Sequence, residues 1–473
     1  MPCGQLDRRR VGHRCGPCKK SHVKCDGGRP CSSCLARGLQ CAPAPGPSSP
    51  FQFVHQRGSN ATTPRIPRVL VQDSWRYIST YFRALGSLTQ AAVMRSPAVT
   101  AMSHDDEGVS RSLSIVGALY ACRNPQVLRI SARERRDVMI TWLRHKAAVE
   151  GELEMTDAAM TRGRFRGVLL SSLLLAVVEL MAGKDDGSFQ VWLARVSNFL
   201  RMHAERRGTE LWTPFERDLV RFFRFLDLLS AISRREMPVE PQVAPEPWPA
   251  RPPELESAPE AGETPDAARI DAMLSTMWEW AVLQRRIHDW IALAEGQHLS
   301  PPETPDGSET SSREQVGLRV QGLDIVCEAT ALQSRMITNL SRLSLDPEPG
   351  PEVSIGPYYR WVLTGVTHNL RHPAWQSLGC ELPVMPPPAL HEQALAALTC
   401  VETLVGSLGL DIAMYLPFAD FVGREMGTEA ERARMLRFLD VVKGKGFDLA
   451  DDYRAYLVEL WEAVGPWEVP AVF

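Results

Sequence analysis

Apolar residues recur at helical spacing along most of the chain beyond residue 70. Trp75, Ile78, Tyr81, Phe82 and Leu85, for example, fall on one face of a helix. Similar stretches follow down the chain, at 191–200, 215–232, 272–294, 318–343, 389–408 and 430–464. Alternating β-branched runs bounded by turn residues are scarce. We therefore predict that residues 70–465 form a large all-α domain whose helices pack as a bundle-like helical array.

Two segments interrupt this pattern. Residues 46–69 are rich in Pro, Ser and Thr, which predicts a flexible linker. Residues 238–266 contain nine prolines and seven acidic side chains, a composition that excludes a helix. We predict that this proline-rich and acidic tract is a long surface loop that splits the helical array.

The longest apolar region, residues 168–181, is interrupted by Ser171, Ser172 and Glu179. It is too short and too polar to span a bilayer, so we predict a buried helix and no membrane partner. The first residues, MPCGQLDRRR, carry no apolar stretch of the kind that a secretory signal needs. We therefore expect a reducing compartment, in which the cysteines do not form disulfides.

Basic side chains are concentrated at the N-terminus. Residues 1–45 hold nine basic and two acidic residues, whereas the rest of the chain holds 44 basic and 54 acidic ones. A basic head followed by an acidic body predicts that the head binds a polyanion and that the body stays off it.

Six of the eleven cysteines fall within residues 15–41, with the spacing C-x2-C-x6-C-x5-C-x2-C-x6-C. The first three recur sixteen residues later as the second three, which makes a short internal repeat. Zinc prefers four tetrahedral ligands, and two separate ions need eight, so six thiolates suffice only if two of them bridge both ions. The repeat nominates the first cysteine of each half, Cys15 and Cys31. We predict two Zn2+ ions, one held by Cys15, Cys18, Cys25 and Cys31, the other by Cys31, Cys34, Cys41 and Cys15.

Three simpler interpretations of the cysteines remain open. A single zinc held by Cys15, Cys18, Cys31 and Cys34 would leave Cys25 and Cys41 unexplained, although they complete the repeat. A redox C-x-x-C pair would need a βαβ context, which the sequence lacks. Chance clustering in a cysteine-rich tract is the third. A segment of this size has too few apolar residues to fold alone, so a metal would have to supply the folding free energy, about 10–16 kcal/mol for structural zinc in finger peptides.

The cysteine pattern, the loop Asp26-Gly27-Gly28 and the loop proline Pro30 closely resemble the fungal Zn(II)2Cys6 binuclear zinc-cluster family of transcription factors. The resemblance implies a nuclear regulator of RNA polymerase II genes whose zinc-cluster helix enters the major groove of double-stranded DNA and reads a GC-rich triplet, commonly CGG. Such regulators often accompany metabolic or secondary-metabolite gene clusters, which makes such a cluster one candidate target.

The candidate base-reading residues depart from the family pattern in one place. Between Cys18 and Cys25 the chain has Lys19, Lys20, Ser21, His22, Val23 and Lys24. Ser21 and His22 stand where the family usually has Arg and Lys. A neutral imidazole can still donate to a base edge, but a solvated surface histidine is an equal interpretation of His22.

Phosphate contacts are expected from the basic residues around the cluster, which are Arg8, Arg9, Arg10, Arg14, Lys19, Lys20 and Lys24. The basic tail Arg8–Arg10 is also interpretable as a solvated tail or a nuclear-import signal. Such contacts bind uniformly, so specificity has to come from the base-facing groups or from a second copy of the module.

The helical body resembles the second variety of the fungal-specific transcription factor domain, on the stretches SSLLLAVVELMAG, FQVWLARVSNFL and RFFRFLDLLSAI. The resemblance implies a regulatory domain that senses effectors or contacts the transcription machinery and co-regulators. Sustained apolar heptads that would predict a dimer are missing, and a homodimer is left open.

No catalytic signature stands out in the body: G-x-S-x-G, P-loop, GxGxxG and H-E-x-x-H patterns do not occur. We therefore predict a DNA-binding regulator and not an enzyme. The alternatives are a zinc-cluster protein-interaction module without specific base reading, and a helical enzyme with an appended zinc module.

Overall fold

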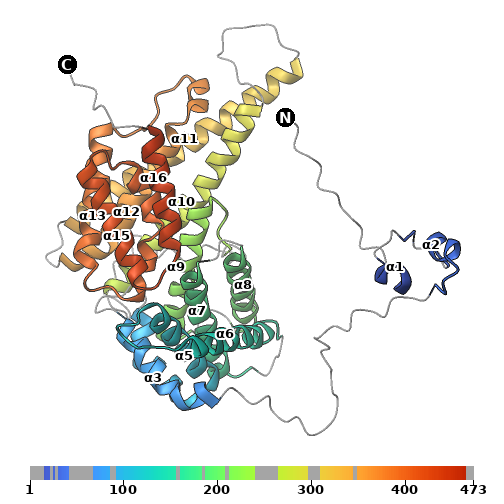
Figure 1. Cartoon of the computed structure of the whole chain (residues 1–473). Coiled ribbons are helices and arrows are strands. Elements are labelled where there is room, and N and C mark those ends of the chain that lie inside the picture. Colours follow the sequence, from blue (N-terminus) through green and yellow to red (C-terminus); the bar gives the residue numbers. More distant parts are fainter. Residues whose placement is uncertain are drawn as a thin grey trace. The chain divides into compact units, whose positions relative to one another are not determined.

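The computed structural model divides into two compact units, Met1–Arg65 and Ile66–Phe473 (Figure 1). The residues that it describes are 15–21, 25–26, 30–41, 68–85, 92–155, 160–183, 187–207, 212–239, 265–296, 309–344 and 349–464. Most of the predicted proline-rich loop, residues 240–264, and the predicted linker up to residue 67 lie outside these ranges.

The second unit is built from helices, and its described residues contain no strand. The prediction of an all-α body is therefore confirmed. In chain order its elements are α3 (Arg68–Ala84), η1 (Ala92–Arg95), α4 (Pro97–Asp105), α5 (Glu107–Arg123), α6 (Ala132–Leu153), α7 (Arg162–Ala182), α8 (Ser188–Arg207), α9 (Pro214–Arg234), α10 (Pro265–Gly296), α11 (Glu309–Ser344), α12 (Pro349–Leu370), η4 (Pro373–Leu378), α13 (Pro387–Leu404), η5 (Leu410–Tyr415), α14 (Phe418–Arg424), α15 (Glu429–Gly444) and α16 (Leu449–Val464).

Several of these helices begin where the sequence provides a cap. Helices α6, α9 and α15 each start with a capping box, in which a Ser or Thr side chain accepts from a backbone amide three residues on and a Glu side chain reaches back. At α9 the pair is Thr213 and Glu216, and Pro214 occupies the first turn.

Helix α7 forms the centre of the body. Its residues are buried around most of its circumference, including Phe165, Leu169 and Leu175 at 0% exposure. The predicted buried helix is thus confirmed. The helix is longer than the apolar stretch that predicted it, and by length and composition (21 residues, mean hydropathy 1.9) it could cross a membrane. Its most apolar window is 78% buried against the other helices, as in the core helix of a globular domain.

Close helix packing at the edge of this core depends on one glycine. Helix α5 crosses α3 at Gly117, where an added Cβ would lie 1.9 Å from the Tyr77 carbonyl oxygen. Only a residue without a side chain allows the two backbones to approach this closely.

Two apolar residues of the stretches that predicted helices are exposed. Trp75 is 53% exposed and its ring lies 4.7 Å from that of His104, and Val191 is 56% exposed. At about 100° per residue Trp75 sits at the margin of its apolar face and Val191 nearly opposite its own. The helical pattern also starts earlier than expected, since α3 begins at Arg68.

Candidate metal centre and nucleic-acid interface

The first unit places the two halves of the cysteine repeat in equivalent local structures. Short helices α1 (Gly16–Lys20) and α2 (Ser32–Ala36) follow Cys15 and Cys31, which occupy the N-cap positions with extended backbone conformations. Cys18 and Cys34 lie one turn further on, so that the two thiols of each half point to the same side. The backbone amide of Cys34 donates to the Cys31 Sγ at 3.4 Å.

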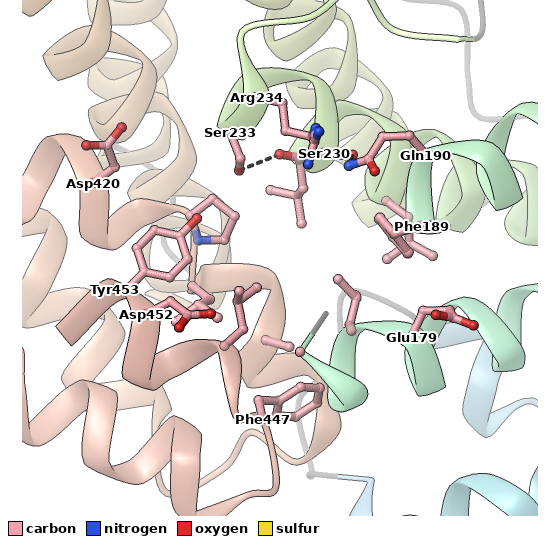
Figure 2. Close-up of a pocket in the computed structure, with 18 of the residues that line it drawn as sticks. Glu179, Phe189, Gln190, Ser230, Ser233, Arg234, Asp420, Phe447, Asp452 and Tyr453 are labelled. Atoms are coloured by element: carbon pink, nitrogen blue, oxygen red, sulfur yellow. Dashed lines mark hydrogen bonds between the residues drawn. The ribbon is translucent and has the colours of Figure 1, made fainter. Parts of the chain in front are cut away.

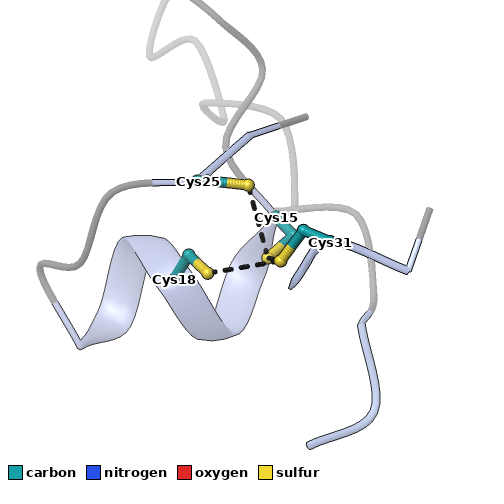
Figure 3. Close-up of side chains that lie close together, drawn as sticks. All are labelled: Cys15, Cys18, Cys25 and Cys31. Carbon is teal, nitrogen blue, oxygen red and sulfur yellow. Dashed lines mark hydrogen bonds between the residues drawn. The ribbon is translucent and has the colours of Figure 1, made fainter. Parts of the chain in front are cut away.

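The six sulfur atoms converge on one centre. Cys15 Sγ lies 3.6 Å from Cys31 Sγ and 3.5 Å from Cys34 Sγ, and Cys18 Sγ lies 3.5 Å from Cys31 Sγ. Cys25 Sγ lies 3.9 Å from Cys15 Sγ, a contact that Figure 3 marks with a dashed line. Adjacent sulfurs around a tetrahedral zinc with bonds of about 2.3 Å lie about 3.8 Å apart, so these separations suit metal ligation.

The sulfurs fall into two overlapping sets of four, in each of which all sulfur atoms lie within 4.8 Å of one another. Both sets contain Cys15 and Cys31. Their members are Cys15, Cys18, Cys25 and Cys31, and Cys15, Cys31, Cys34 and Cys41.

The cysteines themselves form the buried core of this unit. Cys15, Cys18, Cys31 and Cys34 are at most 8% exposed, whereas Leu35 is 69% exposed. The six thiols of the cluster are free and not joined in disulfides. A unit whose described interior consists of free thiols lacks an apolar core, and metal ligation supplies the missing stabilisation.

The two N-cap thiols differ from the other buried thiols in their electrostatics. The backbone amide of Cys18 lowers the pKa of the Cys15 thiol to about 6, and the amide of Cys34 lowers the pKa of the Cys31 thiol. Burial raises the pKa of Cys18 and of Cys34. Since the thiolate is the form that ligates metal, the shared pair is the pair most disposed to ionise.

A contact that the motif alone did not predict joins the loop to the second half. The Asp26 carboxylate accepts from the backbone amide of Ser32 at 3.0 Å, at the first residue of α2. The acidic residue of the loop therefore orders the second helix, in the manner of an N-terminal cap.

The candidate DNA-contacting residues are only partly described. Helix α1 ends at Lys20, and Ser21 follows as its C-cap, with its backbone amide donating to the Pro17 carbonyl at 3.0 Å. Lys20 and Ser21 are exposed. Lys19 lies in α1, but its side chain is outside the described part, as are Arg8, Arg9, Arg10, Arg14, His22 and Lys24.

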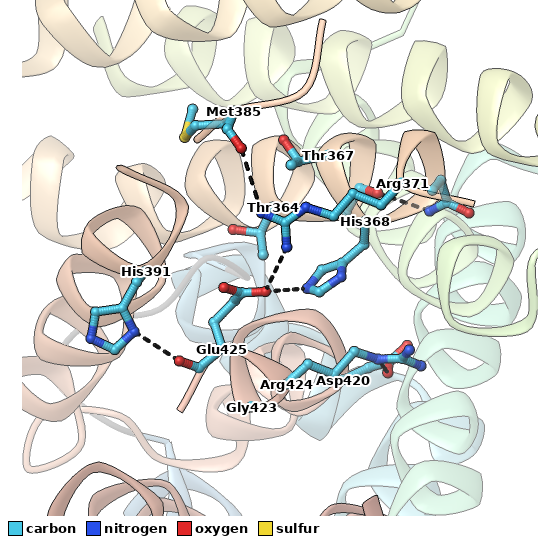
Figure 4. A network of polar contacts seen from close by, with 12 residues as sticks. Thr364, Thr367, His368, Arg371, Met385, His391, Asp420, Gly423, Arg424 and Glu425 are labelled. Carbon is cyan, nitrogen blue, oxygen red and sulfur yellow. Dashed lines mark hydrogen bonds and ion pairs between the residues drawn. The ribbon is translucent and has the colours of Figure 1, made fainter. Parts of the chain in front are cut away.

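The helical body has a buried polar network, but among the described residues only the cysteine sets bring three or more potential metal ligands within 4.8 Å of one another. Glu425, 4% exposed, lies 2.9 Å from His368 Nε2 and 3.6 Å from the Arg371 guanidinium (Figure 4). His391 Nδ1 lies 2.8 Å from the Glu425 carbonyl oxygen. These contacts join α12, α13 and the end of α14. The buried Glu425 carboxylate thus has its polar partners within the protein, as a structural carboxylate does.

Comparison with protein families matches residues 13–49 to the fungal Zn(2)-Cys(6) binuclear cluster domain. No curated protein and no solved structure matches the chain. The match covers the cysteine cluster and not the helical body.

Proposed function

We propose that this chain, whose residues 13–49 form a fungal Zn(2)-Cys(6) binuclear cluster domain, is a nuclear regulator that reads a GC-rich triplet through that domain. The domain binds two zinc ions and makes the chain a zinc-cluster DNA-binding transcription regulator. Beyond this, we propose the GC-rich triplet, the nuclear location and the roles of single residues. The observation that carries the proposal is the pair of four-sulfur sets that share Cys15 and Cys31.

We assign one zinc to Cys15, Cys18, Cys25 and Cys31 and the other to Cys31, Cys34, Cys41 and Cys15. The sulfur separations, the burial of the thiols and the lowered pKa of the two shared cysteines support this assignment. The metal ions supply cross-links that fold the unit, and no chemical reaction on DNA.

DNA binding divides between phosphate and base contacts. The basic residues Arg8, Arg9, Arg10, Arg14, Lys19, Lys20 and Lys24 supply phosphate contacts, which set affinity and position without selecting a sequence. Base reading falls to the end of α1 and the residues after it, where Lys20 is exposed and Ser21 closes the helix. A lysine there donates to guanine O6 and N7.

The alternative function, a zinc-cluster module that binds protein and reads no bases, rests on Ser21 and His22. Ser21 ends the helix with its backbone amide already bonded to Pro17. In this case the basic head would bind DNA weakly and without sequence preference.

Selection of binding sites from random duplex DNA by the purified, zinc-loaded full chain separates the two functions. Enrichment of a CGG-like triplet supports base reading, with one triplet pointing to a monomer and two at fixed spacing to a homodimer. A zinc-loaded chain that enriches no sequence contradicts the proposal and supports the interaction module.

A further inference from the structure

The helical body contains a cavity of about 670 Å3 that the DNA-binding function does not use. Its walls come from two parts of the chain far apart in sequence. One wall is formed by the ends of α7 and α9 and the start of α8, and the other by η5, α14 and α16 (Figure 2). A volume of this size lies within the range of about 300–1,000 Å3 that encloses a drug-sized ligand.

The floor of the cavity is held in place by close backbone packing. Gly183 ends α7 with φ +64°, and a Cβ added there would lie 3.1 Å from the backbone amide of Leu449 at the start of α16. Arg123 pairs with Asp448 at 2.6 Å beside this contact. The two walls are therefore fixed relative to each other at this end, which makes the cavity a preformed site.

The inner surface is mainly apolar and aromatic. Phe189, Phe447, Tyr453 and Tyr456 contribute rings to it from both walls. Figure 2 shows Phe447 and Phe189 on different sides of the space and Tyr453 on the side of α16. Flat aromatic walls favour a ligand with its own ring system, since ring stacking adds to area burial.

Most of the lining charges are satisfied within the protein. Glu179 is contacted by Lys146 at 2.5 Å, and Asp420 accepts from Arg424 at 2.9 Å and from the Tyr456 hydroxyl at 2.9 Å. These groups order the walls and leave little free charge for a ligand.

Arg235 is one of two charged lining residues that form no ion pair among the described residues. It has φ 59°, and it is the one non-glycine residue with a positive φ among the described residues. Within the described part of the chain its guanidinium forms no ion pair. Burial and the Asp420 charge raise the pKa of the Tyr456 hydroxyl, while Arg424 and Arg235 act to lower it, so the positive charge of Arg235 reaches this aromatic wall. Arg235 is the C-cap of α9, and this left-handed helix ending fixes the backbone from which its side chain leaves.

We propose that this cavity binds an aromatic organic acid, with its ring system between the aromatic walls and its acidic group at Arg235. The other such charge, Asp452, has no ion pair within the described part of the chain and lies on the opposite wall, on α16. An acid binds at the Arg235 side and away from Asp452, whereas a cationic ligand would take the reverse orientation. This inference goes beyond the proposed function and does not depend on it.

The test uses the zinc-loaded full chain and two fluorescent probes, the aromatic sulfonate ANS and the uncharged dye Nile red. We expect each probe to titrate to a single saturable site. Ala413→Trp, which fills the cavity from η5, should weaken the binding of both probes by about tenfold or more. Ala292→Trp, at an exposed position of α10, leaves both unchanged. Ser230→Trp repeats the filling from the α9 wall, so that the test does not depend on the folding of a single variant.

Charge variants test whether the ligand is an acid that binds at Arg235. Arg235→Gln is expected to weaken ANS by about tenfold through loss of a charge-assisted contact, with Nile red unchanged. Asp452→Asn should leave ANS binding unchanged or tighter. The proposed site is overturned if Ala413→Trp and Ser230→Trp both fold and bind the two probes as tightly as the parent does. The preference for an acidic ligand is overturned if ANS binds more weakly to Asp452→Asn and not to Arg235→Gln.

Discussion

Cys15 Sγ lies 3.6 Å from Cys31 Sγ, although the two residues belong to different halves of the repeat. Each is the N-cap of a short helix, and each belongs to both of the four-sulfur sets. In the proposed assignment this pair serves both zinc ions, which is how six thiolates would suffice for two metals. The proposed assignment therefore predicts that this pair holds the two halves together as one unit.

Removal of a shared thiol is expected to release the metal from both halves. In Cys31→Ala the bound zinc falls below that of the parent and zinc-dependent DNA binding is lost, because each zinc loses a ligand. The helical content of the body stays unchanged. Cys327→Ala, at an exposed position of α11, is the matched control and should keep zinc and DNA binding. Parent-like DNA binding by Cys31→Ala would refute the sharing of this cysteine.

The basic tail is expected to contribute affinity without specificity. With four to six phosphate contacts, a plot of log K against log salt concentration has a slope of about −4 to −5. Replacement of Arg8, Arg9 and Arg10 by Ala reduces the steepness of this slope by up to about 3 and leaves the preferred sequence unchanged. The control carries the same three changes at Arg133, Arg135 and Arg136, which are exposed on α6. An altered preferred sequence would show that the tail reads bases.

Glu216 is expected to make the body sensitive to acid. Burial acts to raise its pKa, but hydrogen bonds from Arg162, Thr213 and Arg166 more than offset burial and lower the pKa to about 2. The folded-state pKa lies below the usual 4.5, so the stabilisation is present at neutral pH and is lost as the pH falls from about 5 towards 2.

Glu216→Gln should lower the free energy of unfolding at pH 7 by about 3 kcal/mol, because Arg162 and Arg166 lose their buried partner. The difference from the parent should shrink in acid, as urea unfolding at several pH values would show. Glu205→Gln, in an exposed pair with Arg201, should cost less than about 0.5 kcal/mol. A constant difference between pH 7 and pH 3 would contradict the assignment.

Close packing of α5 on α3 predicts opposite effects of one substitution at two glycines. Gly117→Ala should destabilise the body by about 3 kcal/mol, because its Cβ would overlap the Tyr77 carbonyl oxygen. Gly151→Ala in α6, where nothing lies within 4 Å, should stabilise it by about 0.5–1 kcal/mol. Thermal unfolding of the two variants measures both effects, and equal melting temperatures would show that the helices do not pack as described.

Much of the helical body follows from local sequence. Capping residues such as Thr213 and Glu216 mark where helices begin, and the apolar run within α7 is enough to predict a buried helix. Periodicity is less reliable at the margin of a face, as exposed Trp75 shows. Which residues line the cavity could not be predicted, because its walls join segments more than 150 residues apart, from Ser233 to Ala413.

In the cluster, the spacing of the cysteines was sufficient to nominate the two sulfur sets, whose members the structure brings together. The ligand assignment itself stays a prediction. The contact from Ser32 to Asp26 and the lowered pKa of the Cys15 and Cys31 thiols depend on folded geometry, and spacing alone could not reveal them.

The most direct test of the account is a zinc titration of DNA binding. The metal-free full chain is mixed with a duplex obtained by selection, zinc is added stepwise, and bound DNA is followed by fluorescence anisotropy. We expect no specific binding without zinc and a plateau at two zinc ions per chain, because both halves of the cluster must fold before α1 is positioned. A plateau at a single zinc ion, or specific binding in the presence of a chelator, would contradict it.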